Sequence, residues 1–175
     1  MTPEQVSTVF ALMAIAGTVL GVGVLVALAI PGPRARVRAV LAGQGSALAW
    51  LVATIATLGS LYLSEVAHFT PCRLCWFQRI FMYPLSIVLL VGAIRKELTV
   101  RYYALPLSII GLAISVWHYV VQLYPSLEGS SCDPLNPCSS RYVEVFGFIS
   151  IPFMAGAGFT LITVLALFYM KANEE

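Results

Sequence analysis

The sequence Pro-Cys-Arg-Leu-Cys-Trp-Phe-Gln-Arg occupies residues 71–79 and opens an apolar segment that continues to Ile94. A Cys-x-x-Cys pair is typical of redox sites, where one sulfur often has a lowered pKa and reacts as the thiolate. The segment behind it is close to the length of about 20 residues that a helix needs to cross a bilayer. This stretch therefore predicts a redox-active cysteine pair at a membrane surface.

The composition assigns the whole chain to the membrane class. Of its 175 residues, 59% are hydrophobic and 10% are charged, whereas soluble domains carry about 25% charged residues. The net charge is +2 and the chain has no run of lysines and arginines, so we expect no nucleic-acid partner.

Five stretches are long and apolar enough to span a bilayer. The predicted fold is an all-α membrane protein, in which a four-helix transmembrane bundle is preceded by one extra N-terminal transmembrane helix. The five segments cover residues 8–30, 39–64, 76–94, 102–123 and 146–170.

This pattern divides the chain into two parts. Residues 1–38 are predicted to form the extra helix and a basic cytoplasmic loop, and residues 39–175 the redox bundle, with an external cysteine loop at 124–145. The first segment contains Ala27-Leu28-Ala29, which resembles a signal-peptide cleavage site. However, residues 1–8 contain no lysine or arginine, and the apolar run exceeds the roughly 7–15 residues of a signal peptide. We therefore expect it to remain as a helix.

Basic residues predict the orientation of the bundle. Cytoplasmic loops of membrane proteins carry an excess of lysine and arginine, so we expect a multi-pass protein of the plasma membrane with both cysteine pairs on the extracytoplasmic side. Paired cysteines suit that oxidising compartment. The basic residues that share one side when all five segments span are Arg34, Arg36, Arg38, Arg95, Lys96, Arg101 and Lys171.

Arg79 lies one helical turn beyond Cys75 and on the same face, about 6 Å deeper in the membrane. A charged group in lipid is costly, and two interpretations remain open. The guanidinium can extend to the lipid headgroups, or it can donate hydrogen bonds to an anionic or carbonyl group held beside the thiols. The neighbouring Cys75 favours the second interpretation.

The cysteines also allow two structural interpretations, a disulfide without redox function and a zinc site. Zinc sites favour two pairs of similar short spacing, but five residues separate Cys132 from Cys138. We therefore expect no metal. The loop around Cys132 and Cys138 is rich in proline, glycine and serine, and a disulfide there would be open to attack by a thiolate. A simple loop staple remains the alternative.

His118 and Gln122 lie four residues apart on one face of the fourth segment, toward its external end. Such residues often bond to a neighbouring helix. The alternative is a donor to a quinone carbonyl or a proton relay. Because their depth is similar to that of Arg79, one pocket can collect all three, together with Tyr83, four residues beyond Arg79.

With these residues placed, the chain resembles the disulfide bond formation protein B (DsbB) family, especially its short BdbC-type branch. The resemblance covers roughly residues 45–170, and the cysteine–arginine block is its most specific part. The motifs that carry it lie at residues 59–62, 71–84, 115–119, 137–139 and 146–152.

The resemblance implies a membrane enzyme that reoxidises a thioredoxin-like extracytoplasmic partner and passes the electrons to a quinone, menaquinone or ubiquinone. It implies that Cys132 and Cys138 exchange with the partner, that Cys72 and Cys75 are reoxidised by the quinone, and that Arg79 lies against the quinone. Two other functions remain open, a non-enzymatic membrane assembly protein with two structural disulfides and a reductase that works in the opposite direction.

Two features depart from the family. Its members usually have four spanning helices, so the helix at residues 8–30 is extra. The cysteine loop is short, so we do not expect a membrane-surface helix within it; residues 142–148 are the candidate for an interfacial segment instead.

Overall fold

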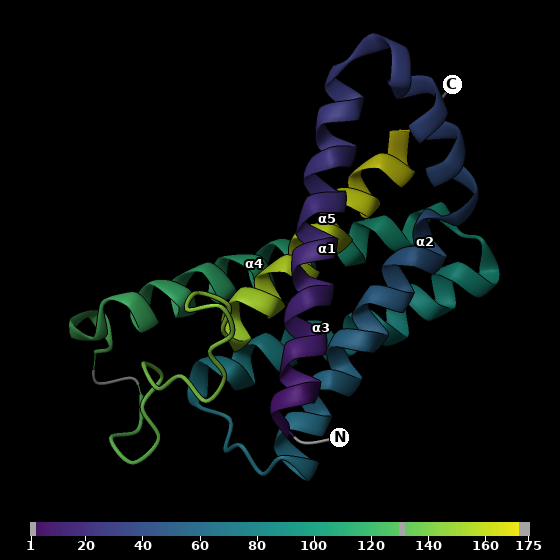
Figure 1. The fold of residues 1–175 in the computed structure, drawn as a ribbon. Coiled ribbons are helices and arrows are strands. Elements are labelled where there is room, and N and C mark those ends of the chain that lie inside the picture. Colours follow the sequence, from purple (N-terminus) through teal and green to yellow (C-terminus); the bar gives the residue numbers. More distant parts are fainter. Residues whose placement is uncertain (1–2, 130–131, 172–175) are drawn as a thin grey trace.

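The computed structural model describes residues 3–129 and 132–171. Each of its five long helices has a stretch long and apolar enough to cross a membrane, and the described residues contain no strand. The prediction of an all-helical membrane protein is therefore confirmed. The helices, shown in Figure 1, are α1 (Pro3–Ala29), α2 (Pro31–Leu61), α3 (Arg73–Arg95), α4 (Arg101–Leu123) and α5 (Ile151–Lys171).

Three short helical turns are also present in the described residues. A π-helical turn, η1 (Tyr62–Val66), extends α2, and two 3-10 turns, η2 (Leu98–Val100) and η3 (Pro125–Leu127), precede α4 and follow it.

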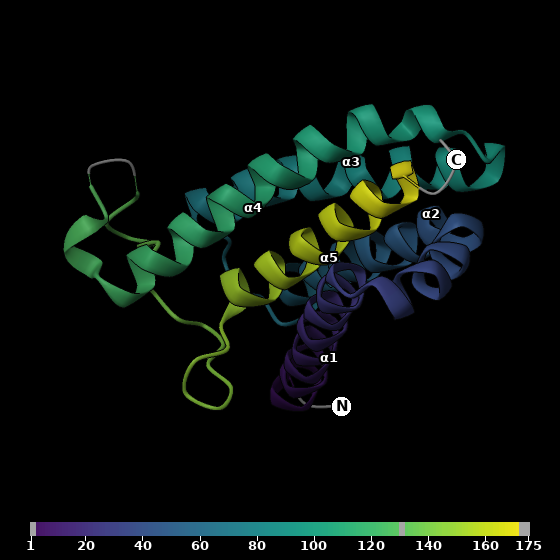
Figure 2. The same ribbon diagram turned by 90° about the horizontal axis from the view of Figure 1, so that it is seen from above.

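Helices α2 to α5 form the bundle, and α1 packs on its outside against α2 and α5. Helix α3 packs between α2 and α4, while α5 packs against both α2 and α4. Successive helices run in opposite directions (Figures 1 and 2), so the segment before α3 and the loop between α4 and α5 lie at one end. Both cysteine pairs therefore belong to the same end of the bundle.

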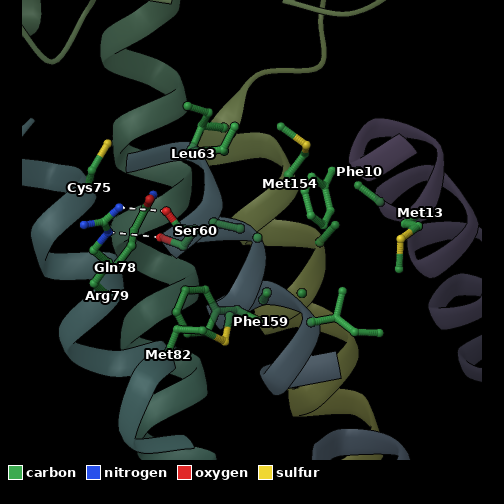
Figure 3. Close-up of a pocket in the computed structure, with 18 of the residues that line it drawn as sticks. Phe10, Met13, Ser60, Leu63, Cys75, Gln78, Arg79, Met82, Met154 and Phe159 are labelled. Carbon is green, nitrogen blue, oxygen red and sulfur yellow. Dashed lines mark hydrogen bonds between the residues drawn. The ribbon is translucent and has the colours of Figure 1, made fainter. Parts of the chain in front are cut away.

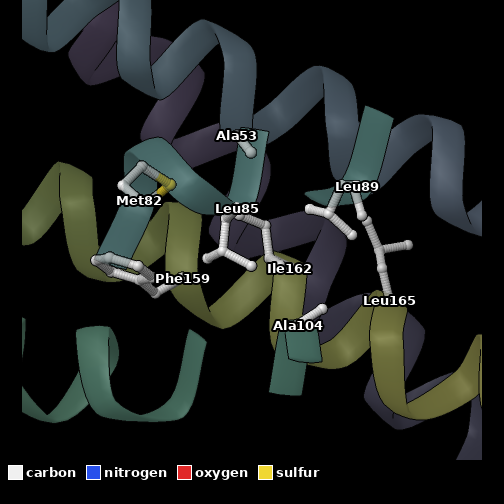
Figure 4. Packing of buried hydrophobic residues seen from close by; sticks show 9 residues of the cluster. Ala53, Met82, Leu85, Leu89, Ala104, Phe159, Ile162 and Leu165 are labelled. Carbon is white, nitrogen blue, oxygen red and sulfur yellow. The ribbon is translucent and has the colours of Figure 1, made fainter. Parts of the chain in front are cut away.

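Buried apolar side chains from four helices hold the bundle together (Figure 4). Leu85 of α3 and Phe159 and Ile162 of α5 are completely buried at its centre. A Cβ atom on Gly111 of α4 would lie 2.3 Å from the Phe159 ring, so only glycine allows α4 to approach α5 this closely. Small residues at such contacts are typical of membrane helices, which associate largely through packing.

The basic stretch predicted as a loop is helical instead. Helix α2 begins at Pro31 and includes Arg34, Arg36 and Arg38, so only Ile30 separates it from α1. Proline is well tolerated in the first turn of a helix, and alanine and arginine are strong helix formers. The side of the membrane on which these arginines lie stays a prediction.

The fifth helix begins at Ile151, five residues later than predicted. Before it, the backbone reverses: Val145 and Ile149 exchange hydrogen bonds of 2.9 and 3.0 Å, and Phe146 and Gly147 adopt φ angles of 54° and 77°. Residues 142–148 form no helix, and their position relative to the membrane stays a prediction.

Candidate functional site

Cys72 and Cys75 form a dithiol at the N-terminus of α3. Cys72 is the N-cap residue rather than part of the first turn, and its sulfur accepts the backbone N–H of Cys75 at 3.4 Å. The two sulfurs lie 3.1 Å apart. The positive end of the helix dipole faces this position and favours negative charge on the sulfur.

The pKa of the Cys72 thiol is lowered to about 4. The hydrogen bond from Cys75 is the largest cause, burial acts against it, and a hydrogen bond from His118 lowers the pKa further. A low pKa makes a cysteine reactive because the thiolate is the nucleophile. In the reduced protein, Cys72 is therefore a thiolate at neutral pH.

A pH titration tests this assignment. In a variant with Cys132→Ala and Cys138→Ala, we expect the ultraviolet thiolate absorbance of the reduced protein to persist down to about pH 5, since the Cys72 pKa is about 4. Because this value lies below the unfolded-state pKa of about 8.5, the thiolate stabilises the fold most at alkaline pH. That stabilisation declines as the pH falls and is gone below the folded pKa.

His118→Ala is the comparison in this titration, and we expect it to move the loss of thiolate absorbance to higher pH. A single ionisation near pH 8–9 in the parent variant would contradict the assignment.

The second pair, Cys132 and Cys138, is joined in a disulfide. Cys138 is fully buried and packs in one small cluster with Cys72 and Val121, while Cys132 is partly exposed. Cys138 therefore faces Cys72 and Cys75, whereas Cys132 is accessible at the protein surface. Because two of the cysteines are bonded to each other, a zinc site made of all four does not fit.

His118 lies between the two cysteine pairs and is 1% exposed. Its Nε2 is 3.0 Å from the carbonyl oxygen of Cys138 and 3.6 Å from Cys72 Sγ, and its Nδ1 is 3.4 Å from Gln78 Nε2. A carbonyl only accepts, so Nε2 carries the proton and Nδ1 accepts from the Gln78 amide. His118 therefore connects the backbone of one pair to the sulfur of the other.

The same assignment argues against a smaller metal site. The donor atoms of Cys72, Cys75 and His118 lie within 4.8 Å of one another. However, a structural zinc site uses four ligands, and the Nε2 of His118 that faces Cys72 holds a proton instead of a free lone pair. The cluster fits a dithiol with a hydrogen-bonding histidine.

Two side chains that the sequence analysis did not single out fix the disulfide loop. The Asn136 amide donates to the carbonyls of Thr70, at 3.4 Å, and Pro71, at 3.1 Å, and accepts the Tyr142 hydroxyl at 2.9 Å. The Glu128 carboxylate accepts the backbone N–H of Cys138. Their residue types carry no sign of these roles, because the contacts arise only when the loop folds over residues 70–72.

Gln122 also holds this loop. Its side-chain Nε2 donates to the Ser140 carbonyl at 3.2 Å, and its backbone carbonyl accepts from Arg141 Nη2 at 3.1 Å. Gln122 thus bonds the cysteine loop to α4.

Arg79 points into the bundle and not toward the headgroups. It is 9% exposed, its Nε donates to Ser60 Oγ at 3.0 Å, and its Nη2 donates to the Ser60 carbonyl at 2.9 Å. Tyr83 donates to the same Ser60 hydroxyl at 3.3 Å, and the Trp76 ring lies 5.1 Å from the guanidinium. These contacts rule out the interpretation in which the guanidinium extends to the lipid headgroups, because Ser60 of α2 holds it in place (Figure 3).

A cavity of about 210 Å³ begins beside Cys75 and Arg79 and lies among α1, α2, α3 and α5. Most of its lining is apolar, including Met82, Met154 and Phe159 (Figure 3). A mostly apolar cavity with a few polar groups at one place is typical of a small-molecule site.

The prediction that one pocket collects Arg79, His118 and Gln122 is wrong. Arg79 and Tyr83 line the cavity, but His118 and Gln122 do not, and no residue of α4 does. The reason is the packing order of the helices. The cavity is bordered by α1, α2, α3 and α5, whereas the polar face of α4 contacts the cysteine loop.

Comparison with known proteins identifies the family. The model for "Disulfide bond formation protein DsbB" matches residues 43–169. "Disulfide bond formation protein C" of Bacillus subtilis is 48% identical over 127 residues, which are 72% of this chain and 92% of that protein. "Probable disulfide formation protein" of Oceanobacillus iheyensis is 46% identical over 126 residues, 71% of this chain and 87% of its own.

A third relative agrees with these two. "Probable disulfide formation protein C 1" of Bacillus anthracis is 45% identical over 125 residues, 70% of this chain and 89% of that protein. No solved structure matches the chain. With two adjacent cysteine pairs, and with five helices able to span a membrane in the part of the chain that the structure describes, the chain belongs to the DsbB family of disulfide bond formation proteins and is a multi-pass membrane oxidoreductase.

Proposed function

We propose that this protein reoxidises a thioredoxin-like extracytoplasmic partner and passes the electrons to a membrane quinone. One observation carries the proposal: the two cysteine pairs meet at His118, and Cys75 opens onto an apolar cavity that also contains Arg79. The overall reaction converts partner dithiol and quinone into partner disulfide and quinol.

The residues of the cavity fit a quinone. A quinone has a flat apolar ring with two carbonyl oxygens, and the cavity combines apolar walls with polar groups at Cys75, Gln78 and Arg79. The bonds to Ser60 use two of the five N–H donors of the Arg79 guanidinium. Arg79 is therefore the residue that would hold a quinone oxygen, and Cys75 the sulfur that would face the ring.

Exchange with the partner begins at Cys132, because Cys138 is buried. The partner thiolate attacks the Cys132 sulfur, and Cys138 leaves as the thiolate. The second thiol of the partner then attacks its own mixed disulfide and releases Cys132. The partner leaves as a disulfide, and the loop holds two reduced cysteines.

Transfer between the pairs follows from the position of Cys138 beside Cys72. The Cys138 thiolate attacks Cys72 of an oxidised Cys72–Cys75 pair, and Cys75 leaves as the thiolate beside Arg79. Cys132 then attacks Cys138, restores the loop disulfide and releases Cys72 as its stabilised thiolate. A bound quinone supplies an acceptor for the two electrons and two protons that Cys72 and Cys75 lose when they reform their disulfide.

Basic residues at one end of the bundle support the membrane orientation in this proposal. Arg95 is the last residue of α3 and Lys96 follows it, so both lie at the opposite end of α3 from the cysteines, where the chain turns into α4 (Figure 1). The positive-inside rule favours a cytoplasmic position for that end, which supports an extracytoplasmic position of the cysteines, in the oxidising compartment where partners of this kind act.

A reconstitution with three components tests the function. Purified protein is mixed with a reduced thioredoxin-like protein and a quinone, and both the quinone absorbance and the free thiols of the partner are followed. We expect one quinone to be reduced for each partner disulfide formed. A quinone that stays oxidised while the partner stays reduced would favour the alternative of a non-enzymatic assembly protein.

A further inference from the structure

Helix α1 contributes to the cavity although it lies outside the family match, which begins at residue 43. Four of its residues line the cavity: Phe10, Met13, Ala14 and Gly17. We propose that α1 forms the end of the cavity that receives the isoprenoid tail, and that it makes the site selective for tailed quinones. This inference rests on the proposed function.

The two ends of the cavity differ in chemistry. Its polar lining side chains come from α2, α3, the segment before α3 and the loop between α4 and α5. Helices α1 and α5 contribute only apolar ones. Figure 3 shows the progression from Cys75 and Arg79, past Ser60 and Met154, to Phe10 and Met13. Quinone oxygens need the donors of the first end, so the end at α1 is left for hydrocarbon.

The wall made by α1 is packed firmly against the bundle. A Cβ atom on Gly59 would lie 2.9 Å from the Phe10 ring, so the ring rests directly on α2, next to the serine that holds Arg79. Gly17 faces Leu161 of α5, where an added Cβ atom would lie 3.6 Å away. Phe10 and Gly17 thus join α1 to α2 and α5, two of the helices that border the cavity.

Met13 marks the exit of the cavity. It lines the cavity and is nevertheless 42% exposed, so it lies at the rim between the interior and the surrounding lipid. The cavity, at about 210 Å³, is smaller than the roughly 300–1,000 Å³ of pockets that enclose a whole drug-sized ligand. A long isoprenoid chain must therefore leave it, and the path past Met13 leads to lipid.

A matched pair of substitutions on α1 tests the inference. Ala14 is buried and lines the cavity, whereas Ala16 lies two residues along on the exposed face. Ala14→Leu fills the tail end, and Ala16→Leu makes the same change toward lipid. Binding is measured by quenching of tryptophan fluorescence with two probes, a menaquinone with an isoprenoid tail and menadione, which has none.

We expect Ala14→Leu to raise the Kd of the tailed menaquinone about tenfold, as for overpacking of a filled site, and to leave the Kd of menadione within about twofold. Ala16→Leu should change neither. Phe10→Ala, which opens the wall instead of filling it, should also weaken only the tailed probe. Exchange of the Cys132–Cys138 disulfide with reduced partner reports on the fold and should stay unchanged in all three variants.

Three results would overturn the inference. If Ala14→Leu and Ala16→Leu bind the tailed menaquinone with equal Kd values, α1 does not belong to the site. If Ala14→Leu loses affinity equally for menaquinone and menadione, α1 contacts the ring and not the tail. If Ala14→Leu slows disulfide exchange while Phe10→Ala binds the tailed menaquinone normally, the weaker binding by Ala14→Leu results from a disturbed fold. A wild-type protein that binds neither probe would instead refute the proposed function on which the inference rests.

Discussion

A Cys138→Ala variant is expected to lose turnover completely and to accumulate a mixed disulfide between Cys132 and the oxidised thioredoxin-like partner. Cys132 is partly exposed and can attack the partner, and without Cys138 no neighbouring thiol in the loop can release it. Cys132→Ala should lose turnover too, but without the mixed disulfide, because Cys138 is fully buried. Non-reducing gels after acid quenching measure both species.

The contrast between these variants identifies which cysteine meets the partner. In Cys132→Ala, the Cys138 thiolate should exchange with the Cys72–Cys75 disulfide and form a Cys72–Cys138 bond, because Cys72 and Cys138 pack in one cluster. Peptide mapping by mass spectrometry detects that bond. Equal amounts of mixed disulfide in both variants would show that burial of Cys138 does not direct the exchange.

An Arg79→Ala variant is expected to reduce quinone about 10²–10³-fold more slowly, the usual effect of removing a preorganised donor from a developing charge. Stopped-flow measurement of quinone absorbance gives this rate. The first exchange between reduced partner and the Cys132–Cys138 disulfide should be unchanged, because Arg79 contacts Ser60, Trp76 and Tyr83 and not the loop.

Two further variants separate the charge of Arg79 from its geometry. Arg79→Lys keeps the charge but loses the two-point hold on Ser60, so we expect an intermediate rate. Arg95→Ala removes an exposed arginine from the other end of the same helix and should have no effect. If Arg79→Ala and Arg95→Ala reduce quinone at the same rate, Arg79 has no part in the electron transfer.

The roles of His118 and Gln122 show the limit of reasoning along one helix. Their spacing correctly predicts a shared polar face at the end of α4 that carries the cysteine loop, but depth alone suggested that this face meets Arg79. In the structure it meets Cys138 and Ser140 of the loop instead. Which neighbour covers a helix face depends on the packing order of the bundle, and the spacing of residues within one segment does not contain that order.

Arg79 illustrates the opposite case. Its position one turn beyond Cys75 is a property of the chain, and it remains beside Cys75 on the cavity wall. The choice between extending to the headgroups and turning inward depends on Ser60, nineteen residues earlier and on another helix. A hydrogen-bond partner at that separation becomes identifiable only once α2 and α3 are packed.

The sequence by itself determined the class of protein, the number of segments long and apolar enough to span a membrane, and the two cysteine pairs that are candidates for the redox centre. These follow from composition, segment length and short motifs, which act locally and need no knowledge of neighbours. Only the tertiary structure decided that Cys138 is buried beside Cys72, that Asn136 and Glu128 fix the loop, and that α1 lines the cavity. Each of these depends on contacts between segments far apart in the chain, whose geometry is set by how the helices pack.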